Sequence, residues 1–279
     1  MATGVTATKT GDPFIDGVLI GTKWSGSITY SFADSVSDFG SPYRFNFNGF
    51  ESLNSSQQFA IRYIIGGDDP SAGNPLFFPY GSFTDVAAIN LSLAANPNGP
   101  SDLVIAQASQ YDDLTDGAGF QQLTTARVLD FPNPSQSTAA GDIVFGNNST
   151  TYADPRAGNF AWATLVHEIG HALGLAHGHN PDDANNGTTG DVIPAWRNSF
   201  DYSIMTYSGA PNSYIDGIVP EQYGNPQTLM MYDIAALQHL YGANYGTNSG
   251  DTTYTWSPTT GQMFLNGVGQ GLPGAGDTS

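Results

Sequence analysis

The chain contains no cysteine among its 279 residues. This absence excludes disulfide bonds, a thiol nucleophile and cysteine ligands for a metal, and it leaves histidine and carboxylate side chains as the available metal ligands. Lysine and arginine are scarce, seven together against 25 aspartates and glutamates, which gives a formal net charge of −18 at pH 7. So acidic a surface argues against nucleic acid and anionic membranes as partners and suits cations, although selection for solubility would give the same composition.

Long apolar runs are missing as well. No stretch approaches the roughly 20 apolar residues of a membrane-spanning helix. Residues 1–12 lack the positively charged start and the apolar run of an ordinary secretory signal. We therefore expect no membrane partner. If the protein is exported, its export signal is expected to lie elsewhere. The length allows one large domain or two small ones, and we expect a monomer.

The spacing of apolar residues predicts an α+β chain. Strands are expected at 27–32, 87–94, 101–108, 140–146 and 253–256, and helices at 56–65, from 160 through the histidines that follow, and at 228–241. Residues 33–50 favour a loop, and residues 119–127 fit a loop or a short strand. The composition divides the chain into an N-terminal arm or possible pro-segment (1–15), a first subdomain (16–177), a loop-rich second subdomain (178–245) and a tail (246–279).

Three of the five histidines fall within eleven residues, in the pattern His-Glu-x-x-His-x-x-Gly-x-x-His. On a helix, His167 and His171 lie one turn apart on the same face, where both can bind one metal ion. Gly174 tolerates the left-handed conformation that ends a helix sharply, so His177 can return as a third ligand. Glu168 lies about 100° round the helix from His167, where it can face a metal-bound water.

This set of residues is typical of a catalytic zinc site. Three imidazoles leave the fourth position open, whereas structural zinc sites close it with a protein ligand. Zinc lowers the pKa of a bound water from about 15.7 to about 7, and Glu168 is suited to take its proton, so the predicted reaction is peptide hydrolysis. Iron or manganese fits the ligand set less well. At average residue usage the full pattern arises by chance roughly once in 10⁵ chains of this length.

The same pattern resembles the metzincin metalloproteases, specifically the bacterial serralysin type. Residues 203–207, Ser-Ile-Met-Thr-Tyr, resemble the Met-turn of that clan, and residues 232–244 are similar to the helix that closes the serralysin catalytic domain. The resemblance implies a metzincin-like catalytic domain: a twisted, mostly parallel sheet packed with the zinc helix, and a smaller loop-rich subdomain ending in a helix. It also implies that Met205 lies beneath the zinc ligands and that Tyr207 reaches the zinc and stabilises the oxyanion.

Serralysins continue into a calcium-binding β-roll that carries a type I secretion signal, and this chain stops before such a roll. Residues 247–254 resemble the family's junction segment, which implies a calcium site, expected to be incomplete here, with Asn248, Gly250 and Thr252 as candidate ligands. The resemblance further implies a secreted, extracellular bacterial protein. Two further histidines lie outside the pattern. His179 is expected in a loop or in a position that supports the metal ligands from behind, and His239 is expected as a buried, hydrogen-bonded core residue.

Metzincins bind peptides along an edge strand above the zinc. By position, Ile143, Val144 and Phe145 are the candidates for that strand, with main-chain pairing giving broad specificity. The leading hypothesis is a secreted zinc endopeptidase acting on proteins or peptides. A metal- or calcium-binding surface or adhesion domain on the same fold is the alternative, which Glu168 disfavours because metal binding alone needs no base. An esterase or amidase using the same site is a third hypothesis.

Overall fold

A five-stranded sheet forms the centre of the computed structural model, which describes residues 2–66, 81–133, 138–179, 191–209, 223–247 and 249–269. The strand order is β5-β3-β6-β10-β9, and the first four strands are parallel to one another while β9 is antiparallel to β10. The strands are β3 (Ile28–Phe32), β5 (Leu91–Leu93), β6 (Leu103–Ala108), β9 (Ala126–Val128) and β10 (Ile143–Gly146). The expectation of a mostly parallel sheet is confirmed.

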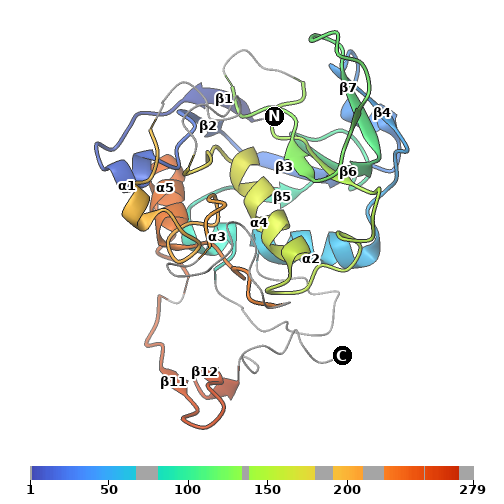
Figure 1. Ribbon diagram of the computed structural model, residues 1–279. Helices are drawn as coiled ribbons and strands as arrows, with labels where there is room; N and C mark the ends of the chain where they lie inside the picture. Colours follow the sequence, from blue (N-terminus) through green and yellow to red (C-terminus); the bar gives the residue numbers. More distant parts are fainter. Residues whose placement is uncertain are drawn as a thin grey trace.

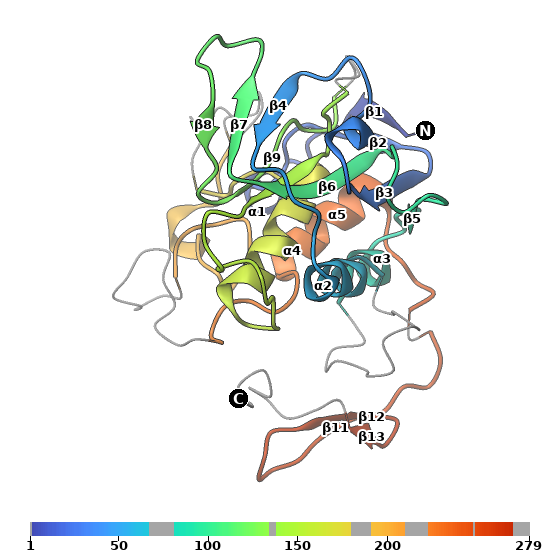
Figure 2. The ribbon, with the colours of Figure 1, turned by 90° about the vertical axis from the view of Figure 1, so that its right-hand side faces the viewer.

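Helices cover one face of this sheet, as Figure 2 shows. They are α2 (Ser55–Gly66), α3 (Phe83–Val86), α4 (Phe160–Ala172) and α5 (Met231–Tyr241), with the short α1 (Pro13–Asp16) against α5. The larger core lies between sheet and helices, and it includes Ile143 and Phe145 of β10. Successive strand residues point to opposite faces, so Val144 belongs to a second core on the other side.

A three-stranded antiparallel sheet covers that second face. It consists of β4 (Phe45–Asn48), β7 (Gln110–Asp113) and β8 (Gln121–Gln122), in the order β4-β7-β8. After Ala108 the chain leaves β6 of the central sheet and continues almost at once as β7 of the outer one. Phe45, Phe47 and Tyr111 pack their rings onto the second core. The prediction of a loop at residues 33–50 is wrong for much of that segment, which contains β4 and the short 3₁₀ helix η1 (Val36–Phe39).

Two of the predicted helices, α2 and α5, begin where side chains bind the free backbone amides of the first turn. Asn54 begins α2: its side chain accepts a hydrogen bond from the Gln57 amide at 2.9 Å, and the Gln57 side chain accepts one from the Asn54 amide at 2.8 Å. This reciprocal pair satisfies amides that a helix start leaves unpaired. At the start of α5, the Asp233 side chain accepts from the Met230 amide at 2.9 Å, so the helix begins later than residue 228.

Residues 2–15, where an arm is expected, are paired and packed. β1 (Thr3–Thr6) pairs antiparallel with β2 (Thr22–Ser25), and α1 follows Asp12, whose side chain caps it. The Asp16 carboxylate accepts from the Thr10 and Gly11 amides at 2.7 and 2.9 Å. The domain boundaries themselves stay predictions.

A small sheet lies apart from the main body in both views (Figures 1 and 2). It contains β11 (Tyr254–Trp256), β12 (Met263–Leu265) and β13 (Val268–Gly269). The remaining short element is the 3₁₀ helix η2 (Ala195–Arg197). In the part of the chain that the structure describes, every helix is too short or too polar to cross a bilayer.

Candidate metal centre and the cleft around it

Helix α4 brings the first two histidines into the core. Asn159 caps its start by accepting from the Trp162 amide at 2.9 Å, and nearly all of its length is buried. His167, His171 and His177 are between 4 and 8 % exposed. Their Nε2 atoms lie 3.0 Å (167 to 171), 3.0 Å (171 to 177) and 3.1 Å (167 to 177) apart. Three ring nitrogens therefore face one point.

The other nitrogen of two rings is fixed by a backbone carbonyl. His167 Nδ1 lies 2.8 Å from the Ile204 oxygen, and His171 Nδ1 lies 2.8 Å from the Leu175 oxygen. Because a carbonyl can only accept, both Nδ1 atoms carry the proton and leave an Nε2 lone pair directed at the shared point. Burial and the neighbouring histidines hold the pKa of His171 well below its usual value, which keeps that ring neutral.

Gly174 makes the turn that returns His177. Its φ is +103°, and a Cβ at this position would lie 2.4 Å from the Thr22 backbone oxygen, so both conformation and space require glycine. Leu175 then donates its amide to the Gly170 carbonyl at 2.9 Å, and its own carbonyl holds His171.

The turn at residues 203–207 lies directly against α4. A Cβ on Gly170 would come within 2.9 Å of the sulfur of Met205, which is fully buried. The Met205 carbonyl accepts from the Gly178 amide at 3.0 Å, which connects the turn to the segment after the third histidine. We call α4 and residues 203–207 the cleft floor.

Asp233 of α5 holds this turn from below. Its carboxylate accepts from the Ser203 hydroxyl at 2.6 Å, from the Ile204 amide at 2.9 Å and from the Met230 amide. The Ser203 oxygen in turn accepts from the Met205 amide at 3.0 Å. Since the Ile204 carbonyl orients His167, Asp233 acts on the histidines through one residue, whose amide it binds. Sequence reasoning missed this residue, although an aspartate three positions after the start of a helix is a capping signal.

Glu168 is buried beside the histidines, with 6 % of its surface exposed. Desolvation raises the pKa of its carboxyl to about 8, while a hydrogen bond from the Val128 backbone and the charge of Arg127 act in the opposite direction. The carboxyl therefore lies at the meeting point of α4 and β9.

Tyr207 extends over the centre from the opposite side. Its hydroxyl lies 2.8 Å from His177 Nε2, and its ring is half exposed. The His179 ring packs against it with 4.4 Å between centroids and lies 5.2 Å from the His177 ring. His239 is exposed and bonds to the Thr8 carbonyl at 2.7 Å, so the expectation of a core role is wrong.

Two cavities meet at Glu168 and Tyr207. One has about 470 Å³ and is mostly apolar; it is lined by residues such as Tyr152, Phe160, Phe200 and Ile204. The other has about 270 Å³ and is more polar, with Gln122, Thr124, Arg127, Phe131 and His177 in its lining. None of the described residues 2–15 lines either cavity.

The strand that borders both cavities is β9. Ile143, Val144 and Phe145 do not form an edge strand, because β10 lies between β6 and β9 and these side chains are only 1 % exposed. That prediction is wrong for a physical reason: strands paired on both sides and covered on both faces are continuously apolar, as this segment is. Among the described strands, β9 pairs with β10 alone, and its other edge faces the cleft.

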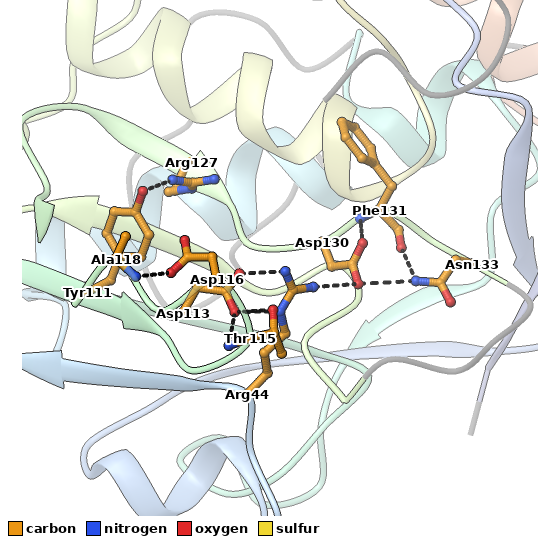
Figure 3. Close-up of polar contacts among 10 residues, drawn as sticks. All are labelled: Arg44, Tyr111, Asp113, Thr115, Asp116, Ala118, Arg127, Asp130, Phe131 and Asn133. Carbon is orange, nitrogen blue, oxygen red and sulfur yellow. Dashed lines mark hydrogen bonds and ion pairs between the residues drawn. The ribbon is translucent and has the colours of Figure 1, made fainter. Parts of the chain in front are cut away.

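Figure 3 shows what holds β9 and the segment after it. Arg44 donates to both carboxylate oxygens of Asp113, its Nε to Oδ1 at 2.8 Å, and lies 3.8 Å from Asp130. This partnership lowers the pKa of Asp113 far below its usual value. Asp130 accepts from the Phe131 amide at 2.9 Å, and the Phe131 ring meets the His171 ring edge-on at 5.5 Å. We call Arg44, β9, residues 129–133 and the β4-β7-β8 sheet together the cleft wall.

Comparison with known proteins agrees with this geometry. No family model matches the chain. Serralysin G of Dickeya chrysanthemi is 30% identical over 251 residues, which cover 89% of this chain and 46% of the relative. A serralysin of Photorhabdus sp. (strain Az29) is 28% identical over 245 residues, covering 85% and 43%. Metallopeptidase AprA of Pseudomonas marginalis is 39% identical over 129 residues, covering 43% and 25%.

The chain belongs to the serralysin-type metalloproteases. It spans less than half the length of these three relatives. Membership in this family implies a metal, and the three histidines could hold it. Tetrahedral zinc with bonds of about 2.0–2.1 Å places its nitrogen ligands about 3.3–3.4 Å apart. The triad is slightly tighter than that, and the oriented lone pairs of His167 and His171 fit such an ion.

The expected calcium ligands of this serralysin-type chain lie in the tail. Asn248 is outside the described residues. Gly250 and Thr252 lie in an exposed segment, where the Thr252 hydroxyl donates to the Gly250 carbonyl at 3.3 Å.

Proposed function

We propose that this chain is the catalytic part of a zinc endopeptidase. His167, His171 and His177 hold the zinc, Glu168 is the general base, and Tyr207 stabilises the oxyanion. The observation that carries the proposal is the convergence of three Nε2 atoms with the Tyr207 hydroxyl over one point, beside a buried carboxyl.

Zinc, when bound, supplies a Lewis acid that lowers the pKa of a coordinated water and polarises a carbonyl. Glu168 has the position to take the proton and pass it to the leaving amine. Its raised pKa belongs to the carboxyl without a metal ion nearby, and a divalent cation at the three nitrogens favours the ionised form that a base requires. Met205 and Gly174 support the ligands without touching substrate.

The peptide substrate is proposed to pair with the free edge of β9. Main-chain hydrogen bonds along an edge strand give affinity without demanding a sequence, while pockets select side chains. The Val128 backbone already reaches Glu168, so a peptide on this edge has its scissile bond close to the base. The larger apolar cavity then takes a side chain on one side of that bond.

The proposal extends to the setting of the enzyme. We place it outside the cell as a monomer, exported by a type I route, with calcium bound near Gly250 and Thr252. The acidic, cysteine-free composition and the serralysin relatives support this setting. Its presence in the culture medium of the source cells tests export, light scattering tests the monomeric state, and calcium titration tests the calcium site.

The decisive experiment compares Glu168→Gln with the unaltered protein on a denatured protein such as casein. We expect loss of about 10²–10⁴-fold in kcat/KM, because a general base contributes that much, with one zinc retained per chain. Glu51→Gln, which changes an exposed carboxylate, is the matched control and should retain full activity.

Zinc-loaded protein that cleaves no polypeptide would overturn the proposal in favour of a metal-binding surface domain. Cleavage of small esters or amides without cleavage of peptides would instead favour the esterase or amidase.

A further inference from the structure

Arg127 is a cation in the cleft that has no carboxylate ion-pair partner among the described residues. Three of the seven basic side chains of this acidic protein have a described ion pair, in each case with an aspartate: Arg44 pairs with Asp113, Arg156 with Asp154 and Lys9 with Asp191. For Arg127, no carboxylate of the described residues lies within ion-pair distance. A positive charge that forms no described ion pair, in a protein with net charge −18, is available to an anionic ligand.

The guanidinium of Arg127 is held in position by Tyr111. It lies over the Tyr111 ring, 4.5 Å from the centroid, and Nη1 donates a hydrogen bond to the Tyr111 hydroxyl (Figure 3). Its Nε is buried and has no hydrogen-bond partner among the described residues. Stacking and the hydrogen bond fix the planar group before any ligand arrives, which reduces the entropy lost on binding.

The strand register places this cation close to the base. Ala126 and Val128 belong to the core beneath the sheet, so Arg127, between them, points to the opposite face, where it lines the smaller cavity. The next residue, Val128, bonds to Glu168 through its backbone, and the charge of Arg127 acts on that carboxyl. With about 3.3 Å per residue along a strand, a peptide paired with β9 has a side chain near Arg127 within about two residues of the scissile bond.

We propose that Arg127 selects peptides with an aspartate or glutamate near the scissile bond, on the side that occupies the smaller cavity. This inference rests on the proposed peptidase function and names its substrate class. Carboxylates match the fork of a guanidinium, and Gln122, Thr124 and Thr125 of the same cavity offer further polar contacts. The wall thus adds a charge preference to an otherwise main-chain mode of binding.

The net charge sharpens this inference. A protein with charge −18 repels acidic peptides at long range, so the surface as a whole cannot produce a preference for them. Salt screens that long-range repulsion more than it screens a half-buried contact. The preference for the acidic peptide should therefore persist or increase at higher salt, whereas a preference produced by the general field would decline.

The test uses matched fluorogenic peptides in which glutamate or glutamine is placed in turn at each of three positions on either side of the scissile bond. We expect kcat/KM to be about tenfold higher for glutamate at one or two neighbouring positions, because a charge-assisted hydrogen bond contributes that much. Arg127→Gln should remove this ratio, Arg127→Lys should keep part of it, and Arg156→Gln, a surface arginine, should leave it unchanged.

An equal rate for both peptides in the unaltered protein, or the same ratio in Arg127→Gln, overturns the inference while leaving the peptidase intact. If the protein cleaves no peptide, the proposed function has failed instead. Binding of the same peptide pair to the Glu168→Gln protein, followed by fluorescence anisotropy, then tests Arg127 without catalysis. Equal affinities of the two peptides overturn the proposed role of Arg127. A Tyr111→Phe variant shows whether the phenol is needed to orient the guanidinium.

Discussion

The floor and the wall of the cleft are built from different interactions. In the floor, buried backbone groups and neutral side chains satisfy one another: carbonyls orient the histidines, and glycines let α4 touch its neighbours. In the wall, charged side chains make many of the contacts. Arg44, Asp113, Asp130 and Arg127 are all partly exposed. The floor is suited to hold ligands within a small tolerance, and the wall is suited to discriminate among substrates.

The largest expected effect is in the floor. Gly174→Ala should reduce the free energy of unfolding by about 3–4 kcal/mol, because strain at positive φ adds to a collision with a backbone oxygen. Gly11→Ala is the matched control: φ is also positive, at +86°, but nothing lies within 4 Å of the added Cβ, so about 1 kcal/mol is expected. Urea unfolding measures both, and equal losses would show that the close contact at Gly174 is unimportant.

A buried carboxyl outside the wall, directly before β10, makes the stability of the fold depend on pH. Asp142 accepts hydrogen bonds from the Tyr43 hydroxyl and the Val104 amide, and burial raises its pKa to about 8. The folded state therefore keeps a proton that the unfolded chain loses above about pH 4. Its stabilising contribution is complete below that pH and declines as the pH rises towards 8.

We expect the free energy of unfolding to fall by about 3 kcal/mol between pH 5 and pH 8 from this group. Asp142→Asn, which cannot ionise, should remove that part of the decline, whereas Asp251→Asn in the exposed tail should not. Parallel pH profiles for the Asp142→Asn and unaltered proteins would contradict the assignment.

Asp233 tests whether the floor depends on one carboxylate. Asp233→Ala leaves two amides and the Ser203 hydroxyl without their acceptor, so we expect a loss of about 2–3 kcal/mol and weaker zinc binding through the displaced Ile204 carbonyl. Asp233→Asn keeps an acceptor and should recover most of the zinc affinity. Unfolding and zinc titration are measured on each variant, and unchanged zinc affinity in the alanine variant would separate this aspartate from the metal centre.

The smallest effect is expected at the ion pair of the wall. Arg44→Gln should cost about 0.5 kcal/mol, since the arginine is 37 % exposed and such pairs are weak in water. The difference from the unaltered protein should shrink at about 0.5 M salt because the charges are screened. A loss comparable to that of Gly174→Ala would mean that the wall is as rigidly built as the floor.

The floor is also the part that the sequence predicts best. Three histidines and a glycine within eleven residues are local, so helical spacing alone brings two of the three ring nitrogens together. The wall depends on pairing between distant segments. β9 has three residues, too few to show a periodic pattern. The role of Arg127 becomes apparent only from its contact with Tyr111, which lies 16 residues earlier in the sequence. Asp233 is predictable as a helix cap, but its contact with residues 203–204 requires the tertiary fold.

That all three histidines come from one short stretch has a consequence for how the fold depends on its metal. Closing a loop of about ten residues costs little entropy, so an unfolded chain can also gather these ligands round an ion. An ion that binds both states stabilises the native one only by the ratio of the two affinities. Zinc should therefore raise the melting temperature less than its affinity for the native protein suggests, and a chain that is still being synthesised can already carry its metal.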